Sequence, residues 1–175
     1  MENKRLQSIP LPETLELVGD GPSFQSTLCT MLEQAKGFEN FSQADLVFLA
    51  KHMKAYRVPE GATIFREGER NSYFCILSEG RVCVYKEDAH NDIKLLTVIP
   101  PGRIFGEISL IDDFPYSASI VAETEAVFLL MSRENFRHCV EERPVLGVRL
   151  LGIIARMLCA RLRSTSGQLI DTLDP

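Results

Sequence analysis

The residues whose types and spacing could do chemistry gather in one segment, Pro100 to Ala122. A short strand is expected to end at Phe105, where Gly106 lets the backbone turn tightly. The next residues can begin one helical turn, and the free N–H groups of a helix start can bind an anion. Glu107 adds a carboxylate that can accept hydrogen bonds from sugar hydroxyls. Small residues leave room for a ligand at the same place: Ser117, Ala118 and Ser119. The segment therefore indicates a site for a sugar phosphate.

Familiar catalytic and metal-binding patterns do not occur in the sequence. The three histidines stand apart, and none belongs to a His-x-His pair: His52, His90 and His138. No Gly-x-Ser-x-Gly motif and no phosphate loop ending in Gly-Lys-Ser or Gly-Lys-Thr is present. The five cysteines are widely spaced without a Cys-x-x-Cys pair, which is typical of buried, reduced thiols. We expect no enzyme activity, no metal and no cofactor.

Composition and charge indicate an ordinary globular chain. It has 175 residues, of which 45% are hydrophobic and 25% charged, and this balance argues against disorder. With 19 Lys and Arg against 24 Asp and Glu, the net charge of −5 argues against nucleic-acid binding, which depends on cations. No run of about 18 apolar residues could cross a membrane, and the N-terminal segment does not fit a secretory signal. The sequence therefore predicts one cytoplasmic domain with no membrane contact.

The elements that must position the site follow from turn signals and periodicity. Residues 1–22 contain several prolines and are expected to form an extended arm, whereas residues 23–54 predict helices. Ser42 can cap the second of these helices with Asp45 in its first turn. Residues 55–131 alternate short β-rich runs with glycine and proline turns, which is typical of a sandwich or barrel.

Two helices are expected at the C-terminal end, over residues 132–164. Pro144 suits the first turn of the longer one, 144–164, and a tail of residues 165–175 follows. Two adjacent apolar seams on this helix are wider than one packing surface needs, so one seam can face a second copy of the chain. The alternative is a helix buried within one monomer. The predicted dimer residues are Leu146, Leu150, Leu151, Ile153, Ile154, Met157 and Leu158.

The segment 104–122 closely resembles the phosphate-binding cassette of cyclic nucleotide-binding domains. That pattern is Phe-Gly-Glu-(Leu/Ile)-(Ala/Ser)-Leu, then Pro-Arg-(Ala/Ser)-Ala-(Thr/Ser)-Val, and the likeness extends over roughly residues 38–165. The resemblance implies an α+β, mainly β fold, namely a double-stranded β-helix or jelly-roll barrel with flanking N-terminal helices and a long C-terminal helix. It also implies a regulatory domain that binds cyclic AMP or cyclic GMP. The ligand-binding residues it implies are Phe105, Gly106, Glu107, Ile108, Ser109, Tyr116, Ser117 and Ala118.

Tyr116 stands where the family pattern has arginine, and it changes what can be expected of the ligand. A guanidinium makes a paired, charged contact with phosphate that a phenol cannot supply. Three interpretations follow: weak cyclic-nucleotide binding with a substitute cation such as Arg103, a different small ligand selected by Tyr116, or a degenerate pocket. In the last case the domain would be an interaction and dimerisation scaffold.

The family's transcription activators carry a DNA-binding domain after the long helix, which we do not expect in this sequence. Only about ten residues follow the predicted last helix, and a helix-turn-helix domain needs several times that length. We therefore expect a stand-alone regulatory homodimer without direct nucleic-acid contact; the alternative is that the sequence is a piece of a longer protein. In this hypothesis a ligand shifts the turn at Gly106–Leu110 and the loop at Ser117, and thereby the C-terminal helices.

Overall fold

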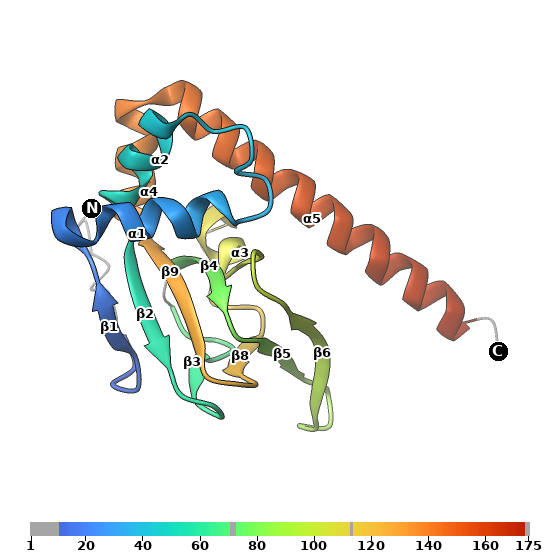
Figure 1. Cartoon of the computed structure of the whole chain (residues 1–175). Coiled ribbons are helices and arrows are strands. Elements are labelled where there is room, and N and C mark those ends of the chain that lie inside the picture. The colour runs from blue at the N-terminus through green and yellow to red at the C-terminus, as the bar shows by residue number, and fades with distance from the viewer. Residues whose placement is uncertain (1–10, 71–72, 113, 174–175) are drawn as a thin grey trace, which may run out of the picture. The chain divides into compact units, whose positions relative to one another are not determined.

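The computed structural model describes residues 11–70, 73–112 and 114–173 (Figure 1). It divides into two compact units, Met1–Asn135 and Phe136–Pro175. The first unit holds the helices α1 and α2, both β-sheets and the candidate cassette, whereas the second holds most of α4 and all of α5. Each unit is described by itself below.

The N-terminal part of the first unit contains one strand that the sequence analysis missed. Strand β1 (Glu16–Gly19) lies within the predicted extended arm and pairs antiparallel with β2 (Lys54–Val58). The prediction of an arm over 1–22 is wrong for these residues, because a short extended segment can satisfy its backbone groups along the edge of a sheet. Residues 1–10 lie outside the described residues.

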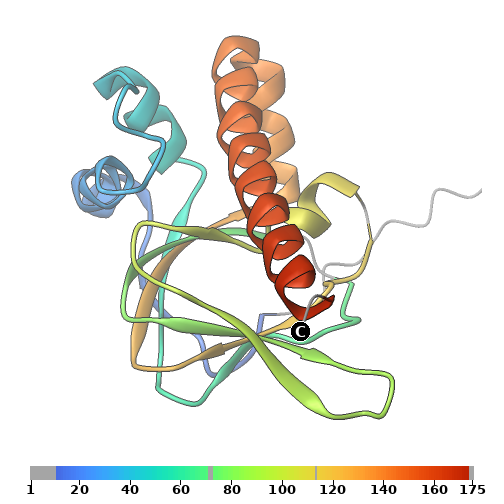
Figure 2. The ribbon, with the colours of Figure 1, turned by 90° about the vertical axis from the view of Figure 1, so that its right-hand side faces the viewer.

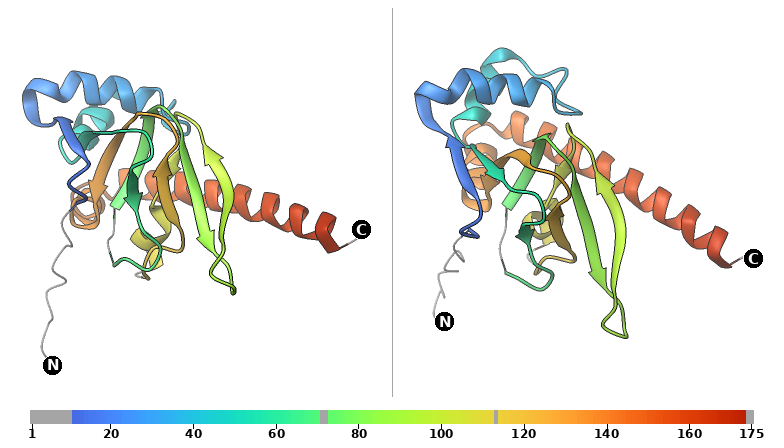
Figure 3. Two further views of the ribbon diagram at one scale, coloured as in Figure 1. Left: turned by 90° about the horizontal axis from the view of Figure 1, so that it is seen from below. Right: turned by 60° about the horizontal axis from the view of Figure 1, so that its bottom comes forward.

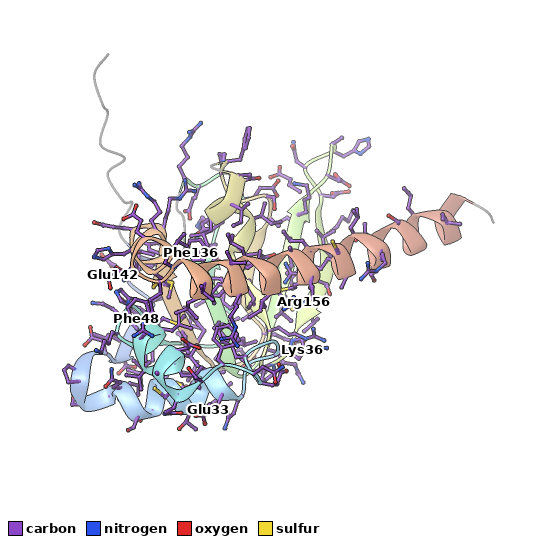
Figure 4. The ribbon with its side chains drawn as sticks, turned by 90° about the horizontal axis from the view of Figure 1, so that it is seen from above. Glu33, Lys36, Phe48, Phe136, Glu142 and Arg156 are labelled. Carbon is purple, nitrogen blue, oxygen red and sulfur yellow. The ribbon has the colours of Figure 1, made fainter. Side chains whose placement is uncertain are left out.

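Two helices follow, and their ends are set by local chemistry. Helix α1 (Gly21–Glu33) begins two residues earlier than expected, since Pro22 lies in the first turn, where its missing N–H leaves no bond unmade. Helix α2 (Gln43–Ala50) has the predicted cap: the Ser42 hydroxyl accepts the Asp45 N–H at 3.2 Å, and the Asp45 carboxylate accepts the Ser42 N–H at 3.4 Å. Figure 4 labels Glu33, at the end of α1, and Phe48, which α2 buries.

The β-body consists of two antiparallel sheets, in the orders β1-β2-β9-β4-β7 and β3-β8-β5-β6, which curve around a common interior (Figure 2). The remaining strands are β3 (Thr63–Phe65), β4 (Tyr73–Glu79), β5 (Val82–Glu87), β6 (Ile93–Ile99), β7 (Ile104–Phe105), β8 (Ser119–Ala122) and β9 (Ala126–Ser132). The mainly β class is confirmed. The body is not a closed barrel, however, because each sheet ends in edge strands that pair on one side only in the described chain. The β5–β6 hairpin extends away from the rest of the body (Figure 3).

Apolar side chains from both sheets fill this interior. Aromatic rings dominate it: the ring centroids of Phe65 and Phe105 are 5.9 Å apart, and Phe105 packs edge-on against Phe128 with centroids 5.6 Å apart. Around them lie mostly aliphatic residues that the alternation of the strands turns inward. The buried cluster consists of Val58, Ile64, Phe65, Cys75, Leu77, Val82, Ile99, Phe105, Tyr116, Ile120, Ala122, Ala126, Phe128 and Leu130.

The helices of the C-terminal region are α4 (Arg133–Glu142) and α5 (Pro144–Leu173). Pro144 begins α5 as predicted, but the helix continues beyond the expected end at Ser164. Most of the predicted tail is therefore helical, since no proline interrupts it before Pro175 and Gly167 alone is tolerated. Gly147 lets α5 approach α4 closely, because a Cβ there would lie 2.9 Å from a methyl group of Val140.

No helix among the residues that the structure describes is long and apolar enough to cross a membrane. Within that same part of the chain, no cluster of His, Cys, Asp and Glu has the arrangement of a metal site. Four cysteines are free and buried, as the spacing predicted, whereas Cys159 on α5 is free but exposed.

Candidate functional site

The site begins where β7 ends, at a glycine that the backbone requires. Strand β7 pairs with β4 through Cys75 and Ile76, which fixes the position of Phe105 and hence of the turn. Gly106 has a φ of +77°, and a Cβ there would lie 2.6 Å from the carbonyl oxygen of Tyr73. Both the left-handed conformation and the close approach exclude a larger residue. This turn starts α3 (Glu107–Asp112) directly behind the sheet.

Glu107 is the first residue of α3, and its side chain points away from solvent. Its exposed fraction is 1%, the same as that of Ser109, whose hydroxyl donates to the Gly106 carbonyl at 3.2 Å. Burial, and after it the negative charge of Glu107, raises the pKa of the Cys75 thiol on strand β4. A buried carboxylate in this position can accept hydrogen bonds from a ligand hydroxyl.

Arg133, which the sequence analysis did not select, also reaches α3. Its Nη2 donates to the carbonyl oxygen of Ser109, and the side chain is partly buried at the start of α4. The sequence carried a weak signal for this contact, because Arg133 directly follows a strand, β9, whose residues are almost all apolar.

Tyr116 is not a surface residue of the cassette but part of the core. Its side chain is 5% exposed, and its ring stacks on Phe65 with centroids 4.4 Å apart and planes inclined by 21°. The phenol oxygen accepts the backbone N–H of Tyr73 at 3.3 Å. Burial in this apolar environment raises the pKa of Tyr116 well above its ordinary value, so the phenol is neutral.

The loop that carries Tyr116 is tied to the turn after β3. The Gly68 N–H donates to the Tyr116 carbonyl at 2.9 Å, and the Tyr116 N–H donates to the Glu69 carbonyl at 3.0 Å. Glu67 adds a third link, since its N–H donates to the Ser119 hydroxyl at 2.9 Å. The loop is thus held by main-chain and hydroxyl contacts of the protein itself.

Lys86 on β5 supplies the cation of this loop. Its Nζ lies 2.6 Å from a carboxylate oxygen of Glu67 and 2.7 Å from the carbonyl oxygen of Ser117. The hydrogen bond from Lys86 lowers the pKa of Glu67, so the Glu67 carboxylate is charged at neutral pH. Lys86 and Glu67 line a hollow of about 490 Å³ that also contains Arg66 and Val121.

Ser119 and Val121 of β8 line the hollow, whereas Ile120 between them belongs to the buried cluster with Tyr116. On β5, Val82 belongs to that cluster and Val84 packs against it. Because successive residues of a strand point to opposite faces, Lys86 leaves β5 on the same face as Val82 and Val84, beside the loop of Tyr116. Arg103, the suggested substitute cation, is exposed in the turn before β7.

The predicted site residues differ in how far they are buried. Phe105, Glu107, Ser109 and Tyr116 are buried, Gly106 and Ala118 are intermediate, and Ile108 and Ser117 are exposed. Their role as ligand contacts stays a prediction.

The predicted dimer residues on α5 also differ in exposure. Four are buried in the single chain: Leu146, Leu150, Ile153 and Ile154. Met157 and Leu158 are partly exposed, and Leu151 is 40% exposed. Dimerisation itself stays a prediction.

Comparison with known proteins agrees with this geometry. The CRP-like cAMP-activated global transcriptional regulator of Mycobacterium tuberculosis is 30% identical over 143 residues, or 82% of this chain and 62% of the regulator. The chain thus spans less than two thirds of that protein. Human cGMP-dependent protein kinase 2 is 36% identical over 100 residues, which is 56% of this chain and 13% of the kinase.

A solved structure covers most of the fold, and a family model covers its central half. The crystal structure of a cyclic nucleotide-binding domain from Methylobacillus flagellatus KT superposes with a TM-score of 0.80 at 26% identity, covering 91% of this chain and 89% of the other. The family model described as "Cyclic nucleotide-binding domain" matches residues 56–143, which is half of the 175-residue chain and includes the whole cassette. The chain therefore belongs to the cyclic nucleotide-binding domain family.

Proposed function

We propose that this chain is a non-enzymatic sensor domain, which binds a cyclic nucleotide or a related small molecule in the cassette and passes the signal on through its C-terminal helices. The observation that carries the proposal is the 1% exposed Glu107 carboxylate at the start of α3, directly after the obligatory Gly106. A buried acceptor beside helical N–H groups suits a sugar whose hydroxyls can donate.

The signal would arise from a difference in affinity between two arrangements of α3 and the cassette loop. A ligand shifts such an equilibrium only as far as it binds one arrangement more tightly. Arg133 links α3 to the start of α4, because it belongs to α4 and donates to the Ser109 carbonyl of α3. A displacement of α3 would therefore also displace the start of α4.

We expect the sensor to act as a homodimer through α5. This helix is 30 residues long and keeps large apolar side chains exposed along it, among them Leu151, Leu162 and Leu169. Parallel helices from two copies would cover these side chains, and twofold symmetry is the commonest arrangement of such assemblies.

A second candidate function is an interaction scaffold with a degenerate pocket. The burial of Tyr116 favours it, because the ring that replaces the family arginine stacks in the core and its hydroxyl is satisfied by Tyr73. In that case the cassette would be structural and no ligand would change it.

A thermal-shift titration separates the two functions. A ligand at a hundredfold excess over its dissociation constant should stabilise the chain by about 2.7 kcal/mol. The titration uses cyclic AMP, cyclic GMP and the corresponding nucleosides at millimolar concentration, with Glu107→Gln as the matched variant. We expect a shift in the wild type that Glu107→Gln removes. If the midpoint does not move with any of these compounds, the sensor function is wrong and the scaffold remains.

A further inference from the structure

Resting on the proposed function, we propose that Lys86 on β5 binds the negative group of the ligand, in place of the arginine that the family pattern has at position 116. The structure brings its ammonium group to the cassette loop, where Nζ lies 2.7 Å from the carbonyl oxygen of Ser117. Ser117 directly follows Tyr116 in the chain. A cation from a different strand therefore reaches the segment in which the family pattern carries one.

The position of Lys86 follows from the register of the sheet. Tyr85 pairs with Ser119, the first residue of β8, so the residue after Tyr85 lies beside the loop that leads into β8. Lys86 shares its face of β5 with Val82 and Val84, and the strand changes from buried to exposed along its length. The alkyl part of the lysine can thus leave the core and place its charged end at the rim.

Tyr116 itself leaves the charge to another residue. Its ring is 5% exposed and stacks on Phe65 in the core, and its hydroxyl accepts the Tyr73 N–H at 3.3 Å. A phenol cannot give a phosphate the charged contact of a guanidinium. Arg103, the cation suggested from the sequence, is exposed in the turn before β7. Lys86 is therefore the cation that the structure bonds to the loop of Tyr116.

Two acceptors of different strength hold the ammonium group of Lys86. One is a carboxylate oxygen of Glu67 at 2.6 Å, and the other oxygen of that carboxylate accepts the Glu87 N–H at 3.2 Å. The second acceptor is the neutral Ser117 carbonyl, which bonds an ammonium group less strongly than an anionic phosphate oxygen does. The Lys86 side chain is 47% exposed, so an anion can reach it. The ligand would replace the Ser117 carbonyl, and Glu67 would compete with the ligand for the lysine.

Calorimetric titration of the full chain with cyclic AMP and with cyclic GMP tests the inference. We expect Lys86→Met to weaken the binding of the cyclic nucleotide about ten- to hundredfold, which corresponds to the loss of a hydrogen bond between charged groups. Lys86→Arg keeps the charge and should bind more tightly than Lys86→Met. Lys94→Met is the matched control, because Lys94 pairs with Asp88 and Asp92 within the β5–β6 hairpin, and it should bind as the wild type does.

The competing carboxylate gives a prediction of opposite sign. Glu67→Gln removes the charge that competes for Lys86, while its amide oxygen can still accept the Glu87 N–H. The affinity for the cyclic nucleotide should therefore rise, by up to about fivefold for a pair as exposed as this one. A lower affinity in Glu67→Gln than in the wild type would contradict this competition.

Salt dependence separates a charged contact from a loosened loop. Between about 50 and 500 mM NaCl the affinity of the wild type should fall as charges are screened, and that of Lys86→Met should fall less. If Lys86→Met binds as tightly as the wild type, or binds more weakly with an unchanged salt dependence, the inference is wrong and the sensor function stands. If neither cyclic nucleotide binds to the wild type or to Glu67→Gln, the inference is wrong, and the thermal-shift titration decides whether the sensor function is wrong as well.

Discussion

At the scale of single residues, the cassette combines one position that cannot vary with one that has changed its chemistry. Gly106 is required by its backbone and by the Tyr73 carbonyl, so it would be needed for folding even without a ligand. At position 116, where the family pattern has a cationic arginine, this chain has a tyrosine whose neutral ring packs in the core. The family pattern in the sequence therefore establishes the geometry of the site more firmly than the identity of its ligand.

The steric requirement for glycine at position 106 can be compared with that at a second glycine. We expect Gly106→Ala to lower the free energy of unfolding by about 3 kcal/mol or more, because the new Cβ meets the Tyr73 oxygen at 2.6 Å in a left-handed conformation. Gly61 has the same φ of +77° with open space around it, so Gly61→Ala should lose only about 1–2 kcal/mol. Guanidinium unfolding of both variants checks this, and equal losses would mean that the close contact at Gly106 does not matter.

At the scale of elements, the cassette loop is held from two sides. The turn after β3 pairs with it through Gly68 and Glu69, and Lys86 on β5 binds its Ser117 carbonyl. These contacts connect three segments that are far apart in the sequence. None could be predicted from local patterns, because each depends on the register of β3, β5 and β8 in one sheet.

Removing the lysine should loosen the loop without unfolding the domain. Lys86 is about half exposed, so its ion pair contributes no more than about 1 kcal/mol, and Lys86→Met should speed amide hydrogen exchange in segment 114–119 about two- to fivefold. Lys94→Met is the matched control, because Lys94 pairs with Asp88 and Asp92 within the β5–β6 hairpin. Unchanged exchange in Lys86→Met, or an equal effect of the control, would contradict the role of Lys86.

Lowering the pH should weaken the same ion pair between Lys86 and Glu67. Lys86 lowers the pKa of Glu67 in the folded chain, so the stabilisation is present at neutral pH and is lost as the pH falls below the ordinary value near 4.5 and through the lowered one. Protection of the amides in 114–119, measured as the exchange rate relative to the intrinsic rate at the same pH, should then fall between about pH 5 and pH 3 in the wild type. Glu67→Gln removes the titrating group, so its loop should show no such fall, and a fall of equal size there would assign the effect to another carboxylate.

At the scale of the whole molecule, the sequence predicted the class of fold and most elements, and it missed what depends on distant pairing. Ser42 and Pro144 mark helix starts by local chemistry, so α2 and α5 begin where expected. Strand β1 was missed because only its partner β2 makes Glu16–Gly19 a strand. Arg133 was missed for the same reason, since its contact with Ser109 joins residues 24 positions apart.

The end of α5 bears on how two copies would meet. Leu151, Leu162 and Leu169 are 40%, 68% and 58% exposed, and with Leu158 they stand seven, four and seven residues apart, which keeps them on one stripe of the helix. Ile154 is only 2% exposed in the single chain, so a charge there would disturb the monomer as well as any dimer. Arg156, labelled in Figure 4, is also exposed but lies off this stripe. The exposed stripe is therefore the surface on which dimerisation can be tested cleanly.

We expect the wild type to sediment as a dimer and Leu162→Glu to shift it to a monomer, because the two introduced carboxylates would face each other across a parallel pair of helices. Ser164→Glu adds the same charge on an exposed position away from the stripe and should leave the dimer intact. Sedimentation equilibrium over a hundredfold range of concentration gives the masses, with circular dichroism to show that α5 remains helical. A wild type that stays at the mass of one chain throughout would exclude the dimer, and equal dissociation of both variants would move the interface away from this stripe.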